Sequence, residues 1–357
     1  MKEFENKIYR RLLAPVLACL VLALAGCSQD AAETEAPSSP TGGTYLTIVT
    51  RGINTTDDTQ YEDYVKTLRV IAFKGDATAS LNVKFAENEL PDHTGSGDDA
   101  EVDLTNQEKL QIGTGGGSYT FYFIANEDNH FTISNTGLSE ALSADDITAE
   151  TLENMQVAFT QEEVNAPLTP ISKYMLMSTK MPVYIKEGVN KPIEVVLDRA
   201  LAKAQLVIQS TSEIATVSVS LPKNEIPASY SLIKQGTIGS SSSASGEDIQ
   251  LDPTTDKPFY DKAESENNQY VSEVVYLPER SATSADDALY YSITIGGNTY
   301  NNVASIADGI TDATKVNYNI IRNFAYTTIC TYSQPATLSL TYTVQPWGTG
   351  GGEHTFN

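Results

Sequence analysis

The sequence predicts an all-β protein built from two tandem β-sandwich domains with few short helices. Three observations support this prediction. Tyr and Phe, which favour strands, occur 19 and 10 times. Short runs of β-branched and aromatic residues alternate with clusters of Gly, Asn, Asp and Pro. At 357 residues the chain is long enough for two domains that each bury a core.

Ten runs after residue 44 have this strand pattern, and many short strands joined by turns are typical of sandwiches. One amphipathic pattern, Ser139–Met155, predicts a helix with Thr148, Asp145 and Asp146 as candidate caps. The expected strands are Tyr45–Thr50, Thr67–Phe73, Ser118–Ala125, Ile193–Leu197, Leu206–Gln209, Ala215–Ser220, Val271–Leu277, Leu289–Ile295, Phe324–Tyr332 and Leu338–Val344.

The first residues predict an export signal. Four cations precede the apolar run 12–25, which matches a signal peptide and is shorter than the roughly 20 residues of a spanning helix. Leu24–Cys27 resembles the lipobox of bacterial lipoproteins, which implies cleavage between Gly26 and Cys27 and lipidation of Cys27. Two or more acyl chains such as palmitate give stable membrane anchoring.

The expected organisation follows from these segments. Residues 1–26 form the signal peptide, and residues 27–44 form an acidic Ser/Pro/Gly tether without apolar periodicity. Residues 45–200 and 201–357 form the N-terminal and C-terminal sandwiches. The net charge of −23 excludes a nucleic-acid partner, because each phosphate contact requires a cation.

The sequence contains no pattern that predicts an enzyme, a cofactor or a metal. His93, His130 and His354 lack the spacing of a zinc site. Gly113–Gly117 lacks the Lys of a phosphate loop and predicts a turn, and the acidic segment Gly95–Asp103 lacks EF-hand spacing and predicts a solvated loop.

Cysteine positions exclude an intramolecular disulfide after export. Cys19 leaves with the signal peptide and Cys27 carries lipid, so Cys330 is the remaining thiol. It lies in an apolar strand-like run, which predicts a buried, inert side chain.

Seven strings, in this order, resemble the fimbrillin family of Bacteroidales, the subunits of type V pili. The resemblance implies two transthyretin-like sandwiches exported as a lipoprotein to the cell surface and outer membrane. The strings are Val65–Phe73, Gly117–Asn126, Tyr174–Ser178, Val196–Lys203, Tyr276–Arg280, Ile321–Tyr326 and Val344–Trp347.

For stalk subunits, the resemblance also implies an assembly mechanism. An arginine-specific surface protease removes the first strand, and a strand of a neighbouring fimbrial subunit fills the groove that this opens. The sequence offers one site for such a cut. Arg51, followed by Gly52, is the sole basic residue between Cys27 and Lys66 and comes directly after the strand Tyr45–Thr50. An ordinary loop arginine is the alternative interpretation.

The C-terminal run Thr337–Val344 offers a donor strand. It alternates apolar and hydroxyl residues, which places Leu338, Leu340, Tyr342 and Val344 on one face. The alternative is that this run is the last strand of the chain's own sheet.

We therefore expect a structural pilus subunit that supports cell adhesion and joins the fimbrium after processing. A fimbrial anchor or tip protein that keeps its lipid is the first alternative. A surface glycan-binding lipoprotein is the second, but it would be expected to present aromatic platforms, and Trp347 is the only tryptophan.

Overall fold

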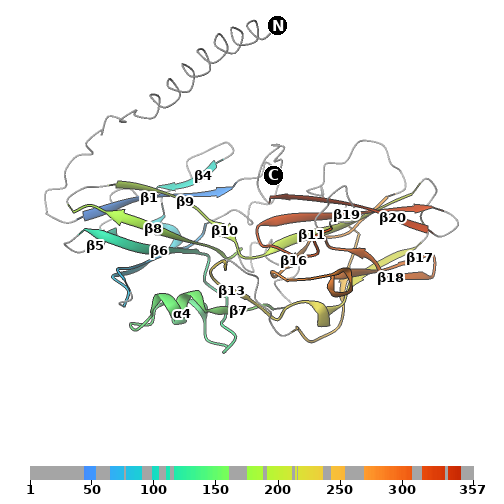
Figure 1. Cartoon of the computed structure of the whole chain (residues 1–357), viewed down its shortest axis with the longest axis horizontal. Helices are drawn as coiled ribbons and strands as arrows, with labels where there is room; N and C mark the ends of the chain where they lie inside the picture. Colours follow the sequence, from blue (N-terminus) through green and yellow to red (C-terminus); the bar gives the residue numbers. More distant parts are fainter. Residues whose placement is uncertain are drawn as a thin grey trace, which may run out of the picture. The chain divides into compact units, whose positions relative to one another are not determined.

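The computed structural model describes residues 44–53, 65–75, 78–90, 99–103, 110–112, 116–160, 175–187, 191–210, 214, 216–235, 243–253, 269–307, 316–333 and 337–346. Within these ranges the fold consists of β-sheets and a few short helices (Figure 1).

Apart from the short strand Gln156–Ala158, the described strands before residue 200 form two sheets, which Figure 1 shows as two layers. In the first sheet β1 pairs antiparallel with β4 and β5 and parallel with β9. Residues 49–51 of β1 pair with both β4 and β9, so these two strands flank β1 on opposite sides. The bounds are Thr44–Ile53 for β1, Asp99–Asp103 for β4, Gln111–Ile112 for β5 and Lys191–Val196 for β9.

The second sheet of this half is antiparallel, in the order β10-β8-β6-β2-β3. Its central strands are rich in aromatic and branched residues, and Phe121, Phe123 and Val70 are fully buried. The bounds are Asp198–Arg199 for β10, Met177–Ile185 for β8, Gly117–Ala125 for β6, Leu68–Phe73 for β2 and Leu81–Phe85 for β3.

The strands after residue 200 repeat this scheme. β11 pairs antiparallel with β15 and β16 and parallel with β19, as β1 does with β4, β5 and β9. A second, antiparallel sheet has the order β14-β12-β17-β18. The bounds are Ala202–Ser210 for β11, Gln269–Val271 for β15, Val275–Leu277 for β16, Phe324–Ser333 for β19, Ile249–Leu251 for β14, Val217–Leu221 for β12, Tyr290–Ile295 for β17 and Asn298–Ser305 for β18.

The second half contains one strand in addition to those that pair in the same way in both halves. β20, Thr337–Pro346, pairs antiparallel with β19 over ten residues and ends the sheet. In the first half, β1 is the single described strand that pairs with β9, the counterpart of β19. A small two-stranded sheet joins strands of both halves, β7 at Gln156–Ala158 and β13 at Ser229–Ser231.

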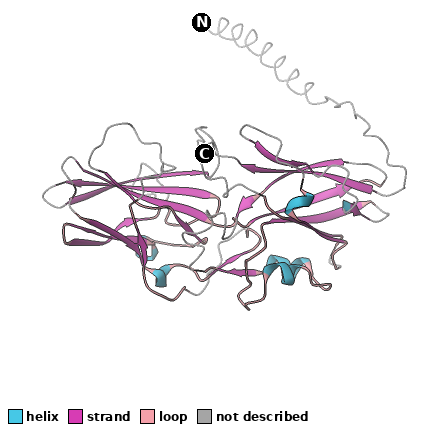
Figure 2. Cartoon of the chain, turned by 180° about the vertical axis from the view of Figure 1, so that it is seen from behind, coloured by secondary structure: helices cyan, strands magenta, loops and turns pink. Residues whose placement is uncertain are grey.

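The helices are short (Figure 2). The predicted helix Ser139–Met155 is two helices, α3 at Leu138–Leu142 and α4 at Ala149–Glu153. Thr148 caps α4 as predicted, because its hydroxyl accepts a hydrogen bond from the Thr151 amide. Three 3₁₀ turns cover Glu87–Glu89, Lys223–Glu225 and Ala285–Asp287.

The prediction of an all-β fold with two sandwiches and few helices is confirmed. A strand is present at each of the ten predicted positions, and Val271–Leu277 is divided into β15 and β16. The domain boundary at 200/201 stays a prediction. The signal peptide 1–26 and the tether 27–44, with Gly26 and Cys27, fall on residues outside the description, except for Thr44 at the start of β1.

Candidate functional site

Arg51 and Gly52 lie inside β1. The sequence places Arg51 directly after the strand, but pairing continues to Ile53. This part of the prediction is wrong because the strand's end is determined by its partners: β4 pairs with residues 49–53, and β9 pairs with residues 46–51. In the backbone register Arg51 lies opposite Glu101 on one side and Val196 on the other.

The strand β9 lies directly beside β1 in the sheet. Ile193 and Val195 are buried, whereas Glu194 and Val196 between and after them are exposed, with Val196 at 51%. This alternation shows that β9 has one face in the core and one in solvent. Because β1 pairs with β9 over six residues, β1 closes the sheet over this part of the N-terminal core.

β20 is an edge strand of its own sheet. Leu340 and Val344 pack against the core, whereas Ser339 and Thr341 are exposed. These four residues therefore show the predicted alternation, and the pairing of residues 337–346 with β19 contains no register shift. The side chains of Leu338 and Tyr342 lie outside the description. In the single chain, β20 is thus the last strand of the chain's own sheet, as in the alternative interpretation of this run.

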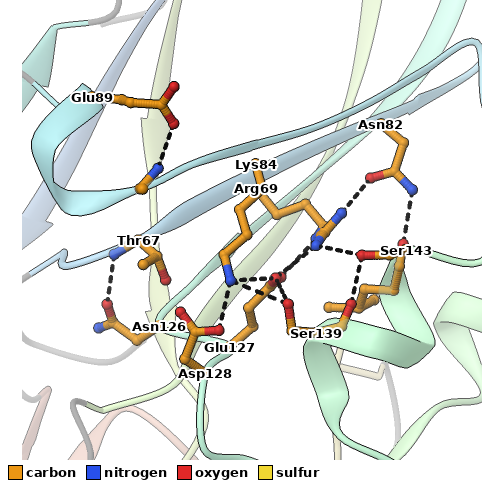
Figure 3. Close-up of polar contacts among 12 residues, drawn as sticks. Thr67, Arg69, Asn82, Lys84, Glu89, Asn126, Glu127, Asp128, Ser139 and Ser143 are labelled. Carbon is orange, nitrogen blue, oxygen red and sulfur yellow. Dashed lines mark hydrogen bonds and ion pairs between the residues drawn. The ribbon is translucent and has the colours of Figure 1, made fainter.

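A buried ion pair fixes the loop after β6 to β2 (Figure 3). Arg69 Nε and Nη2 donate to the two carboxylate oxygens of Glu127, each at 2.7 Å, and both side chains are almost completely buried. Lys84 Nζ lies 3.2 Å from Glu127 and 2.6 Å from Asp128. Ser139 donates a further hydrogen bond of 2.8 Å to Glu127. A buried carboxylate requires such compensation, so this network stabilises the loop and the start of α3.

A second buried cluster joins the two halves of the chain. Arg322, fully buried, donates from Nε to Glu279 at 2.8 Å and from Nη2 to the Ser231 carbonyl at 2.6 Å. Asn323 accepts a 2.9 Å hydrogen bond from Arg199, which is also buried. These contacts connect β10, the end of β13, the segment after β16 and the chain before β19 into one polar junction.

Four of the seven strings that carry the fimbrillin resemblance meet at this junction. The strings 196–203, 276–280 and 321–326 supply its charged residues, and Ser178 of the string 174–178 donates a hydrogen bond to the Leu232 carbonyl. In the sequence, these strings are identified only by their resemblance to the fimbrillin family. The sequence does not predict the junction, because nothing in a single sequence pairs Arg322 with Glu279.

Cys330 is fully buried, as predicted. Burial raises the pKa of its thiol to about 12, so the thiolate is suppressed at neutral pH. The fully buried Tyr291 lies nearby, and burial raises the pKa of its hydroxyl as well.

The described residues contain no group of three or more His, Cys, Asp or Glu that could hold a metal ion. In the same part of the chain no helix is long and apolar enough to cross a bilayer. Phe131 and Tyr184 are the large aromatic side chains with strong exposure among the residues described, at 41% and 68%.

The family described as "Major fimbrial subunit protein (FimA)" matches residues 45–196, which extend from β1 to the end of β9. This part of the chain is therefore similar to fimbrial subunits, as the resemblance of the sequence strings predicts. No curated protein matches the chain.

Three solved structures share the fold of this chain. The tip fimbrial protein Mfa3 of Porphyromonas gingivalis aligns with a TM-score of 0.55 at 16% identity, over 85% of this chain and 100% of its own. A fimbrial assembly protein of Parabacteroides distasonis gives 0.51 at 14%, over 85% and 96%. A putative cell adhesion protein of the same organism gives 0.52 at 14%, over 87% and 99%. The likeness therefore extends across both halves of the chain.

Proposed function

We propose that this chain is a fimbrillin, a stalk subunit that reaches the outer membrane surface as a lipoprotein acylated at Cys27. An arginine-specific surface protease then cuts between Arg51 and Gly52 and frees the subunit for assembly with other fimbrial subunits. The observation that carries this proposal is the position of β1. It is the first strand, it bears the single arginine between residues 11 and 69, and it occupies an interior position in its sheet.

Loss of β1 has a direct physical consequence. The backbone of β9 loses its strand partner over six residues, and the sheet opens beside the buried Ile193 and Val195, which reduces its cover of the core. An unpaired interior edge beside apolar side chains is unstable in water and favours the addition of another strand. A strand of a neighbouring subunit would restore the hydrogen bonds and the cover.

β20 is the candidate donor. It has ten residues, the same number as β1, and it lies at a sheet edge with apolar residues at alternate positions. Its departure would break its pairing with β19 and no other strand pairing. The cost of leaving β19 is then offset by the same kind of pairing in the neighbour.

A fimbrial anchor that keeps its lipid is the second candidate. The observation that favours it is the pairing of Arg51 on both sides, since extended strands inside a sheet are poor protease substrates. An anchor would retain β1 and present other surfaces to the fibre.

Two substitutions of one residue separate these candidates. Arg51→Ala and Arg51→Lys should both leave the subunit lipidated and unassembled on the cell, because an arginine-specific protease accepts neither. Trypsin cuts after lysine, so limited trypsin treatment should restore assembly to Arg51→Lys and not to Arg51→Ala. Normal fibres from both variants would show that the cut is not needed and would favour the anchor.

The donor role of β20 has a matched pair of variants. Leu340→Glu places a charge on the face that packs on the core, whereas Ser339→Glu places it on the exposed face of the same strand. We expect Leu340→Glu to abolish fibre formation and Ser339→Glu to preserve it. Monomer unfolding of both variants distinguishes a lost donor from a destabilised fold, and fibres from Leu340→Glu would exclude β20 as donor.

A further inference from the structure

Arg51 has no free backbone edge in the folded chain. Its segment of β1 pairs with β4 through residues 49–53 and with β9 through residues 46–51. A protease binds an extended substrate along its backbone, so one of the two neighbouring strands must leave before the bond after Arg51 can enter an active site.

The two neighbours are held very differently. β9 buries Ile193 and Val195 in the core and continues through the buried Leu197 into the polar junction at β10. β4 has five residues and pairs with β1 alone among the described strands. Alternate residues Asp99, Glu101 and Asp103 make its sequence acidic and poor in apolar groups. Release of β4 breaks one strand pairing among the described strands, whereas release of β9 would also remove Ile193 and Val195 from the core, so local opening should occur at β4.

We propose that β4 is a strap over the processing site, and that its release from β1 controls the rate of cleavage after Arg51. β1 stays on β9 while β4 detaches, which frees the edge of β1 next to the scissile bond. The inference rests on the proposed processing at Arg51 and adds its regulation. Conditions or partners that hold β4 on β1 keep the subunit uncut, and those that release it commit the subunit to assembly.

A reversible crosslink between the two strands tests the strap. The register places Thr50 opposite Val102 and Val49 opposite Asp103, and these successive pairs represent the two geometries of an antiparallel ladder. The double variants Thr50→Cys/Val102→Cys and Val49→Cys/Asp103→Cys are made in the full chain with Cys19→Ser and Cys27→Ser. The native Cys330 is buried and does not compete.

Limited trypsin digestion of these variants is stopped at set times, and every sample is then reduced, because the disulfide links the two products of a cut after Arg51. Mass spectrometry of the reduced samples measures the fragment that begins at Gly52. We expect this fragment to form at least about tenfold more slowly in the chains digested in the oxidised state than in those digested in the reduced state, because cleavage follows the population of the open form. A disulfide between β17 and β18, from Thr294→Cys/Thr299→Cys, is the control and should leave the rate unchanged. Equal rates in the oxidised and reduced strap variants would overturn the proposal.

A variant that weakens the pairing of β4 with β1 should make cleavage after Arg51 faster. Val102→Pro removes a backbone donor from β4 and weakens its pairing, so the Gly52 fragment should appear at least about threefold faster than in the parent chain. An unchanged rate contradicts the strap. If native and Val102→Pro chains stay uncut while the urea-unfolded chain is cut after Arg51, local release of β4 is excluded. If the N-terminal residue of fibre subunits is also not Gly52, the proposed processing itself fails.

Discussion

The first strands of the two halves, β1 and β11, pair with the same kinds of neighbouring strand. They differ in how firmly the rest of the chain holds them in the sheet. Each pairs antiparallel with two short strands and parallel with one long strand. β11 is buried from Ala202 to Ile208, its basic residue Lys203 is 3% exposed, and the chain continues on both sides of it. β1 carries Arg51 near its end, so one cut separates it from both sandwiches.

This difference shows that an interior position in a sheet does not make a strand permanent. Pairing stabilises β1 and β11 alike, but a cut next to β11 would still leave the fragments joined by the hydrogen bonds of Asn323 with Arg199 and Asp198. The proposed cut after Arg51 would detach β1 together with the tether and the lipid. In the proposed assembly, β20 of a neighbouring subunit would then take the place of β1.

The largest expected effect concerns the junction that joins the halves. Arg322→Ala leaves Glu279 without its buried partner and removes one donor from each of the Ser231 and Leu232 carbonyls, so the free energy of unfolding should fall by about 3–5 kcal/mol. Urea denaturation measures this loss. Lys234→Ala is the control, because that side chain is 44% exposed and 3.7 Å from Asp198, and it should cost less than about 1 kcal/mol. Similar losses in both variants would contradict the junction.

Alkaline pH should weaken the C-terminal half more than the N-terminal half. In the C-terminal half, burial raises the pKa of Cys330 and of Tyr270 to about 12 each, and it also raises the pKa of Tyr291. In the N-terminal half, burial raises the pKa of Tyr122. The folded chain keeps these protons while the unfolded chain loses them above pH 9 to 10, so stability present at lower pH is lost as pH rises.

Urea denaturation at a series of pH values between 8 and 12 measures this slope, which we expect to be about 1 kcal/mol per pH unit for each fully buried group. Cys330→Val removes one of the groups and should flatten the slope. A stability that stays constant up to pH 11 would show that the thiol and the phenols ionise freely in the fold.

Removal of β1 should loosen the N-terminal half alone. After a cut at Arg51 and removal of the fragment, the amides of β9 should exchange with solvent about tenfold faster, because they lose a paired strand. The amides of β19 should be unaffected, since they pair with β11 and β20. Hydrogen exchange with mass spectrometry measures both strands, and equal acceleration in β19 would mean that the two halves do not respond separately.

The smallest effect concerns the α-helices, which the described residues contain only in the first half. Thr148→Ala removes the N-cap of α4 and should cost about 1 kcal/mol, whereas Thr148→Ser keeps a capping hydroxyl and should cost much less. Thermal unfolding compares the two variants. Equal stabilities would show that the cap does not support the helix.

The sequence predicts those features that depend on local pattern. The apolar runs of β1, β6 and β20 predict strands, and the apolar surroundings of Cys330 predict its burial. β4 is missed because Asp99–Asp103 is acidic and becomes a strand only through its partner β1. β8 is missed because Lys180 and Pro182 interrupt its apolar pattern.

Features that depend on distant partners are harder to predict. The extension of β1 past Thr50 depends on β4 and β9, so the sequence alone places Arg51 outside the strand. The buried charges Arg69 and Arg322 look like surface residues in the sequence, because their carboxylate partners are 58 and 43 residues away. The family strings mark both arginines but do not indicate which residues they contact.

The N-terminal residue of subunits purified from surface fibres tests the central claim most directly. Mass spectrometry of intact fibre subunits should find a chain that begins at Gly52 and carries no lipid. Subunits in the fibre that begin with acylated Cys27 and retain Thr44–Ile53 would contradict the account, because β1 would then remain in its sheet and leave no place for a donor strand.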